Sequence, residues 1–287
     1  MPYETHIVTA NGLQFTCLEM GQGPLVLCFH GFPDTPYGFL PLMEIIAGKG
    51  YRVVAPFMRG YAPTQKPVDG DYSITRLAAD VLALMDALAQ DNEKPLVIGH
   101  DWGAFAAYTA ANYAPEKFAG LVHMCVPHMH VRNMSWQQVR KSWYVWLFQL
   151  PCLPEKKLAQ QDFSLVDRLY RDWSPHWQHD GHATDEIKKV LSEPGGVKAA
   201  LAYYRGMIRG MSRKQWKLMS QQTSVPALVV AGLADGSIDA HQFNGIEKAF
   251  VGPFRYVQYD QIGHFPQREC PQQLAEDILE FIEQCAG

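Results

Sequence analysis

The sequence predicts an α/β protein whose core is a mostly parallel sheet covered by helices on both faces, with an inserted helical segment. Short apolar runs alternate with helix-length segments up to about residue 125. This strand pattern stops from about residue 131 to residue 224 and then returns. The 287 residues, 47% of them hydrophobic, suffice for one large domain that buries roughly three quarters of its unfolded surface.

Composition excludes several classes of protein. Lys and Arg number 25 against 29 Asp and Glu, so the basic excess of a nucleic-acid-binding protein is missing. The six cysteines form no CxxC pair, and the first eleven residues lack the basic stretch and apolar run of a signal peptide. No apolar stretch has the length needed to span a bilayer. We therefore expect a cytoplasmic protein that binds neither nucleic acid nor membrane.

Four short apolar runs, at residues 25–30, 51–56, 95–99 and 121–126, are expected to form buried strands. The strand pattern returns at residues 227–232 and 255–259. Nearly continuous apolar runs suit strands that are buried on both faces of a sheet. The sequence therefore favours parallel strands joined by covering helices.

Helices are expected between and after these strands. Residues 74–89 place apolar side chains at helical spacing after Ser73, an N-cap residue type, and residues 104–113 are rich in alanine. A last amphipathic helix is expected at 271–282. The segment 131–224 holds six of the seven tryptophans and reads as several short helices. The chain thus divides into a core (1–130), a helical insertion (131–224) and a second part of the core (225–287).

The motif Gly-His-Asp-Trp-Gly at 99–103 lies between an expected strand and an expected helix. A strand, a sharp turn flanked by glycines and a helix form a nucleophile elbow, which exposes its central side chain above the sheet. That side chain is Asp101, at a helix N-terminus that favours negative charge. The alternative is a solvent-exposed N-cap aspartate in an ordinary βα turn.

Asp235 and His264 follow the expected strands at 227–232 and 255–259. Both are therefore expected at the carboxyl edge of the sheet, where active sites of open α/β sheets lie. An ester formed on Asp101 needs a base that activates water and an acid that orients the base. His264 is the candidate base and Asp235 the candidate acid.

The motif His-Gly-Phe-Pro at 30–33 follows the first core strand. The backbone N–H of Phe32, beside that of Trp102 after the nucleophile, is expected to form an oxyanion hole. The alternative is a simple Gly-Pro turn.

These motifs resemble the soluble epoxide hydrolase branch of the α/β-hydrolase fold family, over essentially the whole chain. The matching motifs are HGFPD at 30–34, RGY at 59–61, GHDWGA at 99–104 and GHFPQRECP at 263–271. The order Asp101, Asp235, His264 is also the family's order of nucleophile, acid and base. The resemblance implies that the helical insertion is a lid over the nucleophile.

The resemblance also implies two lid tyrosines that hydrogen-bond the epoxide oxygen. One precedes a Phe-Gln pair by four residues, and Phe148-Gln149 places Tyr144 there. The other lies in a Tyr-Arg pair, which fits Tyr204, although the adjacent Tyr203 stays open as an alternative. Most of the thirteen tyrosines are expected only to pack in the protein interior.

The implied reaction converts a small lipophilic epoxide and water to a vicinal diol through an ester on Asp101. It needs neither a metal nor an organic cofactor. We expect the substrate to contact Phe32, Trp102, Phe148 and Phe265, and a homodimer is a possible assembly.

Four other functions compete with this one. Haloalkane dehalogenases share the Asp, acid and His arrangement but usually carry Asn where Phe32 stands, and fluoroacetate dehalogenases carry Arg where Trp102 stands. Asp101 itself disfavours a serine esterase. A noncatalytic ligand-binding relative commonly lacks one member of the triad, and none is missing here.

Overall fold

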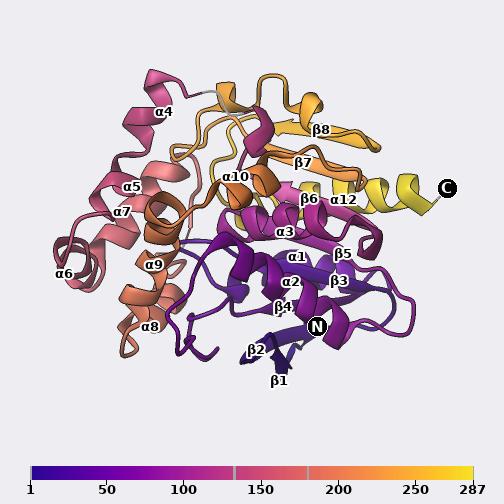
Figure 1. Cartoon of the computed structure of the whole chain (residues 1–287), viewed down its shortest axis with the longest axis horizontal. Helices are drawn as coiled ribbons and strands as arrows, with labels where there is room; N and C mark the ends of the chain where they lie inside the picture. Colours follow the sequence, from indigo (N-terminus) through magenta and orange to yellow (C-terminus); the bar gives the residue numbers. More distant parts are fainter. Residues whose placement is uncertain (1, 132–133, 180, 287) are drawn as a thin grey trace.

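The computed structural model describes residues 2–131, 134–179 and 181–286. Its centre is an eight-stranded sheet with the strand order β1-β2-β4-β3-β5-β6-β7-β8 (Figure 1). The strands are β1 (Glu4–Ala10), β2 (Leu13–Met20), β3 (Leu25–Phe29), β4 (Arg52–Pro56), β5 (Leu96–His100), β6 (Gly120–Met124), β7 (Ala227–Gly232) and β8 (Phe254–Tyr259).

The six strands from β3 to β8 pair in parallel, which confirms the α/β class expected from the sequence. The antiparallel hairpin of β1 and β2 was not expected. In β1 only Val8 and Ala10 are buried, so the strand lacks a continuous apolar run. Asn11 and Gly12 both have positive φ and form the two-residue turn that closes the hairpin.

Two pairs of helices cover opposite faces of the sheet (Figure 1). On one face α2 (Ile74–Leu88) packs against α3 (Trp102–Tyr113), and on the other α1 (Leu40–Ala47) packs against α12 (Pro271–Ala286). The short α11 (Pro266–Glu269) precedes α12. The 3₁₀ helices are η1 (Pro36–Phe39), η2 (Pro115–Lys117), η3 (Met129–Val131), η4 (Ala240–Phe243) and η5 (Ile246–Ala249).

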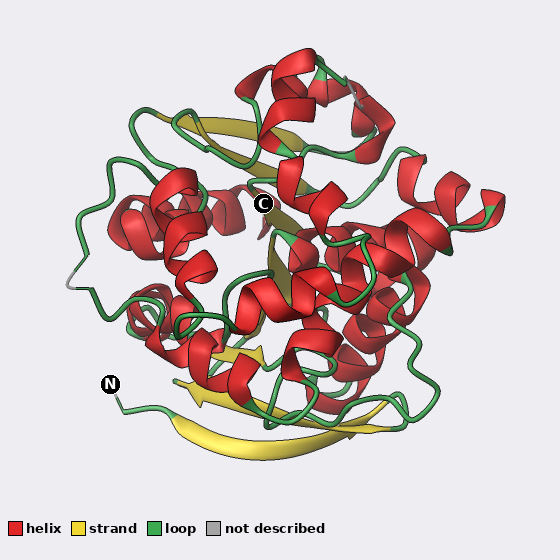
Figure 2. Cartoon of the chain, turned by 90° about the vertical axis from the view of Figure 1, so that its left-hand side faces the viewer, coloured by secondary structure: helices red, strands yellow, loops and turns green. Residues whose placement is uncertain are grey.

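Seven α-helices of the described chain lie between β6 and β7. They are α4 (Trp136–Lys141), α5 (Trp143–Leu147), α6 (Leu153–Ala159), α7 (Ser164–Trp173), α8 (Asp185–Ser192), α9 (Gly196–Arg209) and α10 (Arg213–Ser220). In Figure 2 this helical insertion lies in front of the strands, at one end of the sheet. None of the helices in the described ranges combines the length and the apolar composition that crossing a bilayer requires.

Candidate active site

Asp101 occupies a strained turn between β5 and α3, with φ 49° and ψ −115°. L-residues rarely adopt such a conformation, and it persists only where the surrounding structure enforces it. The flanking glycines are sterically required. A Cβ atom at Gly99 would strike Ala104, and one at Gly103 would strike the backbone of Phe29. The residue pattern of the turn therefore builds the elbow that the sequence predicts.

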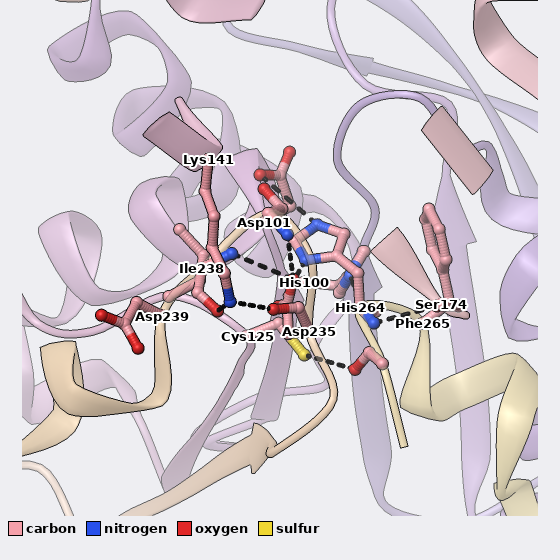
Figure 3. A network of polar contacts seen from close by, with 12 residues as sticks. His100, Asp101, Cys125, Lys141, Ser174, Asp235, Ile238, Asp239, His264 and Phe265 are labelled. Carbon is pink, nitrogen blue, oxygen red and sulfur yellow. Dashed lines mark hydrogen bonds and ion pairs between the residues drawn. The ribbon is translucent and has the colours of Figure 1, made fainter. Parts of the chain in front are cut away.

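Asp235 and His264 both lie beside Asp101 at the carboxyl edge of the sheet (Figure 3). The distance from His264 Nδ1 to Asp235 Oδ2 is 2.8 Å. The other ring nitrogen, Nε2, is 3.9 Å from Asp101 Oδ2 and has no hydrogen-bond partner in the described part of the chain. All three side chains are buried. Asp235 therefore orients His264 as a base, and Nε2 of His264 faces the Asp101 carboxylate.

The loop after β7 holds the Asp235 carboxylate in place. Its Oδ1 accepts hydrogen bonds from the backbone N–H groups of Ser237, at 2.6 Å, and Ile238, at 3.0 Å. Lys141 at the end of α4 donates to the backbone carbonyls of Asp235 and Ile238 (Figure 3). Lys141 was not among the expected site residues, since no local sequence pattern links it to a loop almost a hundred residues away.

Two backbone N–H groups converge on the Asp101 carboxylate. The N–H of Phe32 donates to Asp101 Oδ1 at 2.8 Å, and the N–H of Trp102 also hydrogen-bonds this carboxylate. A Cβ atom at residue 31 would strike the Asp101 side chain, so Gly31 permits the close approach of the two loops. The two donors expected for an oxyanion hole therefore lie together at Asp101.

Burial raises the pKa of Asp101 to about 6, although the charge of His264 and the two backbone hydrogen bonds act to lower it. The carboxyl group is therefore mostly ionised at neutral pH. Burial alone would lower the pKa of His264, but the charge of Asp235, its hydrogen bond and the charge of Asp101 together raise it above its usual value. These groups stabilise the imidazolium that forms when His264 accepts a proton.

Tyr144 on α5 and Tyr204 on α9 face Asp101 across a cavity that all three residues line. The rings of the two tyrosines meet edge to face, with their centroids 5.9 Å apart. Burial raises the pKa of both phenols, so both are protonated at neutral pH. The hydroxyl of Tyr203 instead donates to the backbone carbonyl of Arg59, and Tyr203 is not part of the cavity wall. Of the two adjacent tyrosines, the structure brings Tyr204 to the site.

The cavity has a volume of about 630 Å³ and a mostly apolar lining. Methionines and tryptophans form much of the wall, and among the described lining residues only Asp101 and Arg213 carry a charge at neutral pH. Apolar cavities with few polar groups are typical of small-molecule sites. The lining consists of Asp101, Trp102, Phe105, Val126, Pro127, Met129, Met134, Gln138, Ser142, Tyr144, Val145, Trp146, Tyr204, Met207, Ile208, Met211, Ser212, Arg213, Trp216, Ile238 and Gln242.

Of the four residues expected to contact substrate, Trp102 lines this cavity, whereas Phe32, Phe148 and Phe265 do not. Phe148 packs edge-on against both Phe32 and Tyr204. Phe265 stacks on Tyr170 at a centroid distance of 4.4 Å. The rings of these three phenylalanines fill the space behind the tyrosines and the base, and their contacts with substrate stay a prediction.

One group of potential metal ligands lies beside the triad. Ligand atoms of His100, Cys125 and His264 are within 4.8 Å of one another. His100 Nε2 is 2.6 Å from the backbone carbonyl of His264, and His264 Nδ1 is bound to Asp235. These contacts hold the triad in place, and they explain why the three side chains lie close together.

Known proteins resemble this chain along nearly its full length. The family described as the alpha/beta hydrolase fold matches residues 24–269. The AB hydrolase superfamily protein YfhM of Bacillus subtilis is 29% identical over 283 residues, which cover 96% of each chain. Epoxide hydrolase A of Mycobacterium tuberculosis is 27% identical over 311 residues, again 96% of each chain. The structure of epoxide hydrolase I of potato (Solanum tuberosum) superposes with a TM-score of 0.82 at 27% identity, covering 99% of this chain and 100% of that chain.

Proposed function

We infer the function from two premises: the chain belongs to the α/β-hydrolase fold family, and its buried site joins a carboxylate at the elbow to an oriented histidine. We propose that it is an epoxide hydrolase, which converts a lipophilic epoxide and water to a vicinal diol. One observation carries the proposal. The Asp101 carboxylate shares one apolar cavity with the two lid phenols, Tyr144 and Tyr204.

In the first step, a carboxylate oxygen of Asp101 attacks an epoxide carbon. The bond from that carbon to the epoxide oxygen breaks, and the electron pair stays on the oxygen. Tyr144 and Tyr204 stabilise this developing alkoxide by hydrogen bonding or proton transfer, the role of a general acid. The product is a hydroxyalkyl ester on Asp101.

In the second step, His264 takes a proton from a water molecule, which attacks the carboxyl carbon of the ester. The N–H groups of Phe32 and Trp102 stabilise the tetrahedral oxyanion. Asp235 keeps the imidazole oriented and stabilises its positive charge. When the ester bond breaks, His264 returns its proton to the departing diol oxygen. The second proton of the water, left on the Asp101 carboxyl group, passes through solvent to the tyrosine that protonated the alkoxide, and Asp101 is again a carboxylate.

The segment 131–224 acts as the lid in this proposal, since it supplies both phenols and most of the apolar cavity wall. A lipophilic epoxide fits such a wall because transfer of apolar surface out of water is favourable. The cytoplasmic location and the homodimeric assembly stay predictions from the sequence.

Turnover assays separate this function from its alternatives. We expect the purified protein to convert an aryl epoxide to its diol and to release no halide from a bromoalkane. Halide release without diol formation would identify a dehalogenase. Specific binding of the epoxide without either product would identify a noncatalytic binding protein.

The lid tyrosines provide a second test. Tyr144→Phe and Tyr204→Phe should each slow ester formation by about tenfold to a thousandfold, the effect of losing a general acid, and the double variant should be nearly inactive. Tyr203→Phe is the matched control, because it removes the adjacent hydroxyl, which bonds to Arg59 instead of facing the cavity. The rate of ester formation in a single turnover, measured on folded variants, distinguishes a catalytic role of the tyrosines from a packing role. Wild-type ester formation by the double variant would show that the tyrosines only pack.

A further inference from the structure

Ser237 connects the acid of the triad to the lid. It is only 1% exposed and lies in the loop after β7. Its backbone N–H donates to Asp235 Oδ1 at 2.6 Å, and its backbone carbonyl accepts from Gln138 Nε2 at 3.0 Å. Its hydroxyl oxygen lies 2.9 Å from the phenol oxygen of Tyr144. One residue therefore contacts both the group that orients the base and a phenol of the alkylation step.

Helix α4, which belongs to the lid, is hydrogen-bonded to the loop after β7 that contains Ser237. Gln138 Oε1 accepts from the backbone N–H of Asp239 at 2.8 Å, and the hydroxyl of Ser135 donates to Asp239 Oδ2 at 2.9 Å. Lys141 adds its two hydrogen bonds to backbone carbonyls of the same loop (Figure 3). Tyr144 follows three residues after Lys141. Its position relative to Ser237 is thus held by several polar contacts.

The direction of the bond between Ser237 and Tyr144 follows from a count of protons. In the described part of the chain, each of the two hydroxyls has the other as its only hydrogen-bond partner. If Tyr144 donated, the buried Ser237 proton would have no acceptor, which is unfavourable. If Ser237 donates, its proton is paired with the phenol oxygen, and the unpaired proton is that of the phenol, which can point into the cavity that Tyr144 lines and meet a substrate oxygen there.

We propose that Ser237 is a positioning residue that donates its hydroxyl proton to the phenol oxygen of Tyr144 and so aims the phenol proton at the epoxide oxygen. This inference rests on the proposed function. As the Asp101 oxygen bonds to the epoxide carbon, the epoxide C–O bond breaks and the phenol proton moves to the released oxygen. The Ser237 hydroxyl then stabilises the phenolate, which later regains a proton from water.

The electrostatics agree with this geometry. Burial and the charge of Asp101 raise the pKa of Tyr144, whereas the hydrogen bond from Ser237 lowers it. At Tyr204, burial and the charge of Asp101 raise the pKa, and the Trp102 side chain acts to lower it, so the support of this phenol comes from the elbow and not from Ser237. Ser237 should therefore act through Tyr144 alone.

Rapid-quench mass spectrometry of the Asp101 ester tests the inference. Ser237→Ala should slow ester formation about tenfold, the effect of losing one hydrogen bond to a charged group, and should leave ester hydrolysis unchanged. In a Tyr144→Phe background the same change should have no further effect, whereas in a Tyr204→Phe background it should keep its full effect. Ser237→Thr, which retains the hydroxyl, should recover most of the rate.

Two controls separate positioning from stability. Thr184→Val removes another buried lid hydroxyl, which bonds to Asp167 outside the cavity wall, and should leave ester formation unchanged. Ser237→Cys keeps the side-chain volume with a weaker donor, and it takes the place of the alanine variant if that variant does not fold.

An equal loss of rate with and without the Tyr144 hydroxyl would overturn the inference, as would a wild-type rate in Ser237→Ala. A wild-type enzyme that forms no ester would instead refute the proposed function, which is a distinguishable result.

Discussion

Replacing Asp101 with alanine should abolish diol formation. Asp101 is the only carboxylate among the described residues of the cavity wall, so no other group there can form the ester. Loss of an enzyme nucleophile lowers turnover by about a millionfold in favourable cases. Diol production from an aryl epoxide, measured at saturating substrate, checks the effect.

The fold should survive this change. The Asp101 carboxylate is buried and its backbone is strained, and neither feature stabilises the native state. The change also leaves the buried N–H of Phe32 without its acceptor, which offsets this gain, so we expect a folded protein with a thermal unfolding midpoint close to that of the wild type. Asp86→Ala, which removes an aspartate of a surface ion pair with Lys117, should retain full activity. Substantial diol formation by folded Asp101→Ala protein would exclude Asp101 as the nucleophile.

Replacing His264 with glutamine should trap the ester. The base acts only in the second step, so ester formation continues while hydrolysis slows by about a hundredfold to ten-thousandfold. With excess epoxide, intact-protein mass spectrometry should show one added substrate mass, and peptide mapping should place it on Asp101.

His6→Gln is a suitable control for the trapping experiment, because His6 lies on β1, outside the cavity wall, with its side chain 3.5 Å from Glu19 of β2. It should turn over normally and accumulate no ester. An adduct on another residue, or no adduct in folded His264→Gln protein, would exclude the assigned role of His264.

The core of the fold was predictable because buried parallel strands leave a local signal. Each of the runs from β3 to β7 is apolar enough to be recognised without knowledge of its neighbours, whereas the edge strand β8 is marked by its aromatic and β-branched residues. Strand β1 has one solvent-exposed face, so its buried residues alternate with exposed ones. Such a pattern is short and weak in β1, so this strand was not expected from the sequence.

The site was predictable where local sequence determines backbone geometry. The glycines around Asp101 are required by steric contacts, and Asp235 and His264 follow recognisable strands. The choice between Tyr203 and Tyr204 needed the structure, because neighbouring side chains on a helix point in directions about 100° apart. Ser237 also left no sequence signal, since it lies 93 positions from Tyr144.

Isotope labelling in a single turnover tests the covalent mechanism most directly. With enzyme in excess over epoxide in heavy-oxygen water, water attacks the carboxyl carbon of the ester, and the oxygen delivered to the diol comes from Asp101. The covalent mechanism predicts the heavy oxygen in the Asp101 carboxylate and an unlabelled diol from the first turnover. Heavy oxygen in the first-turnover diol would contradict it, because water would then attack the epoxide directly and Asp101 would serve only as a base or an orienting charge.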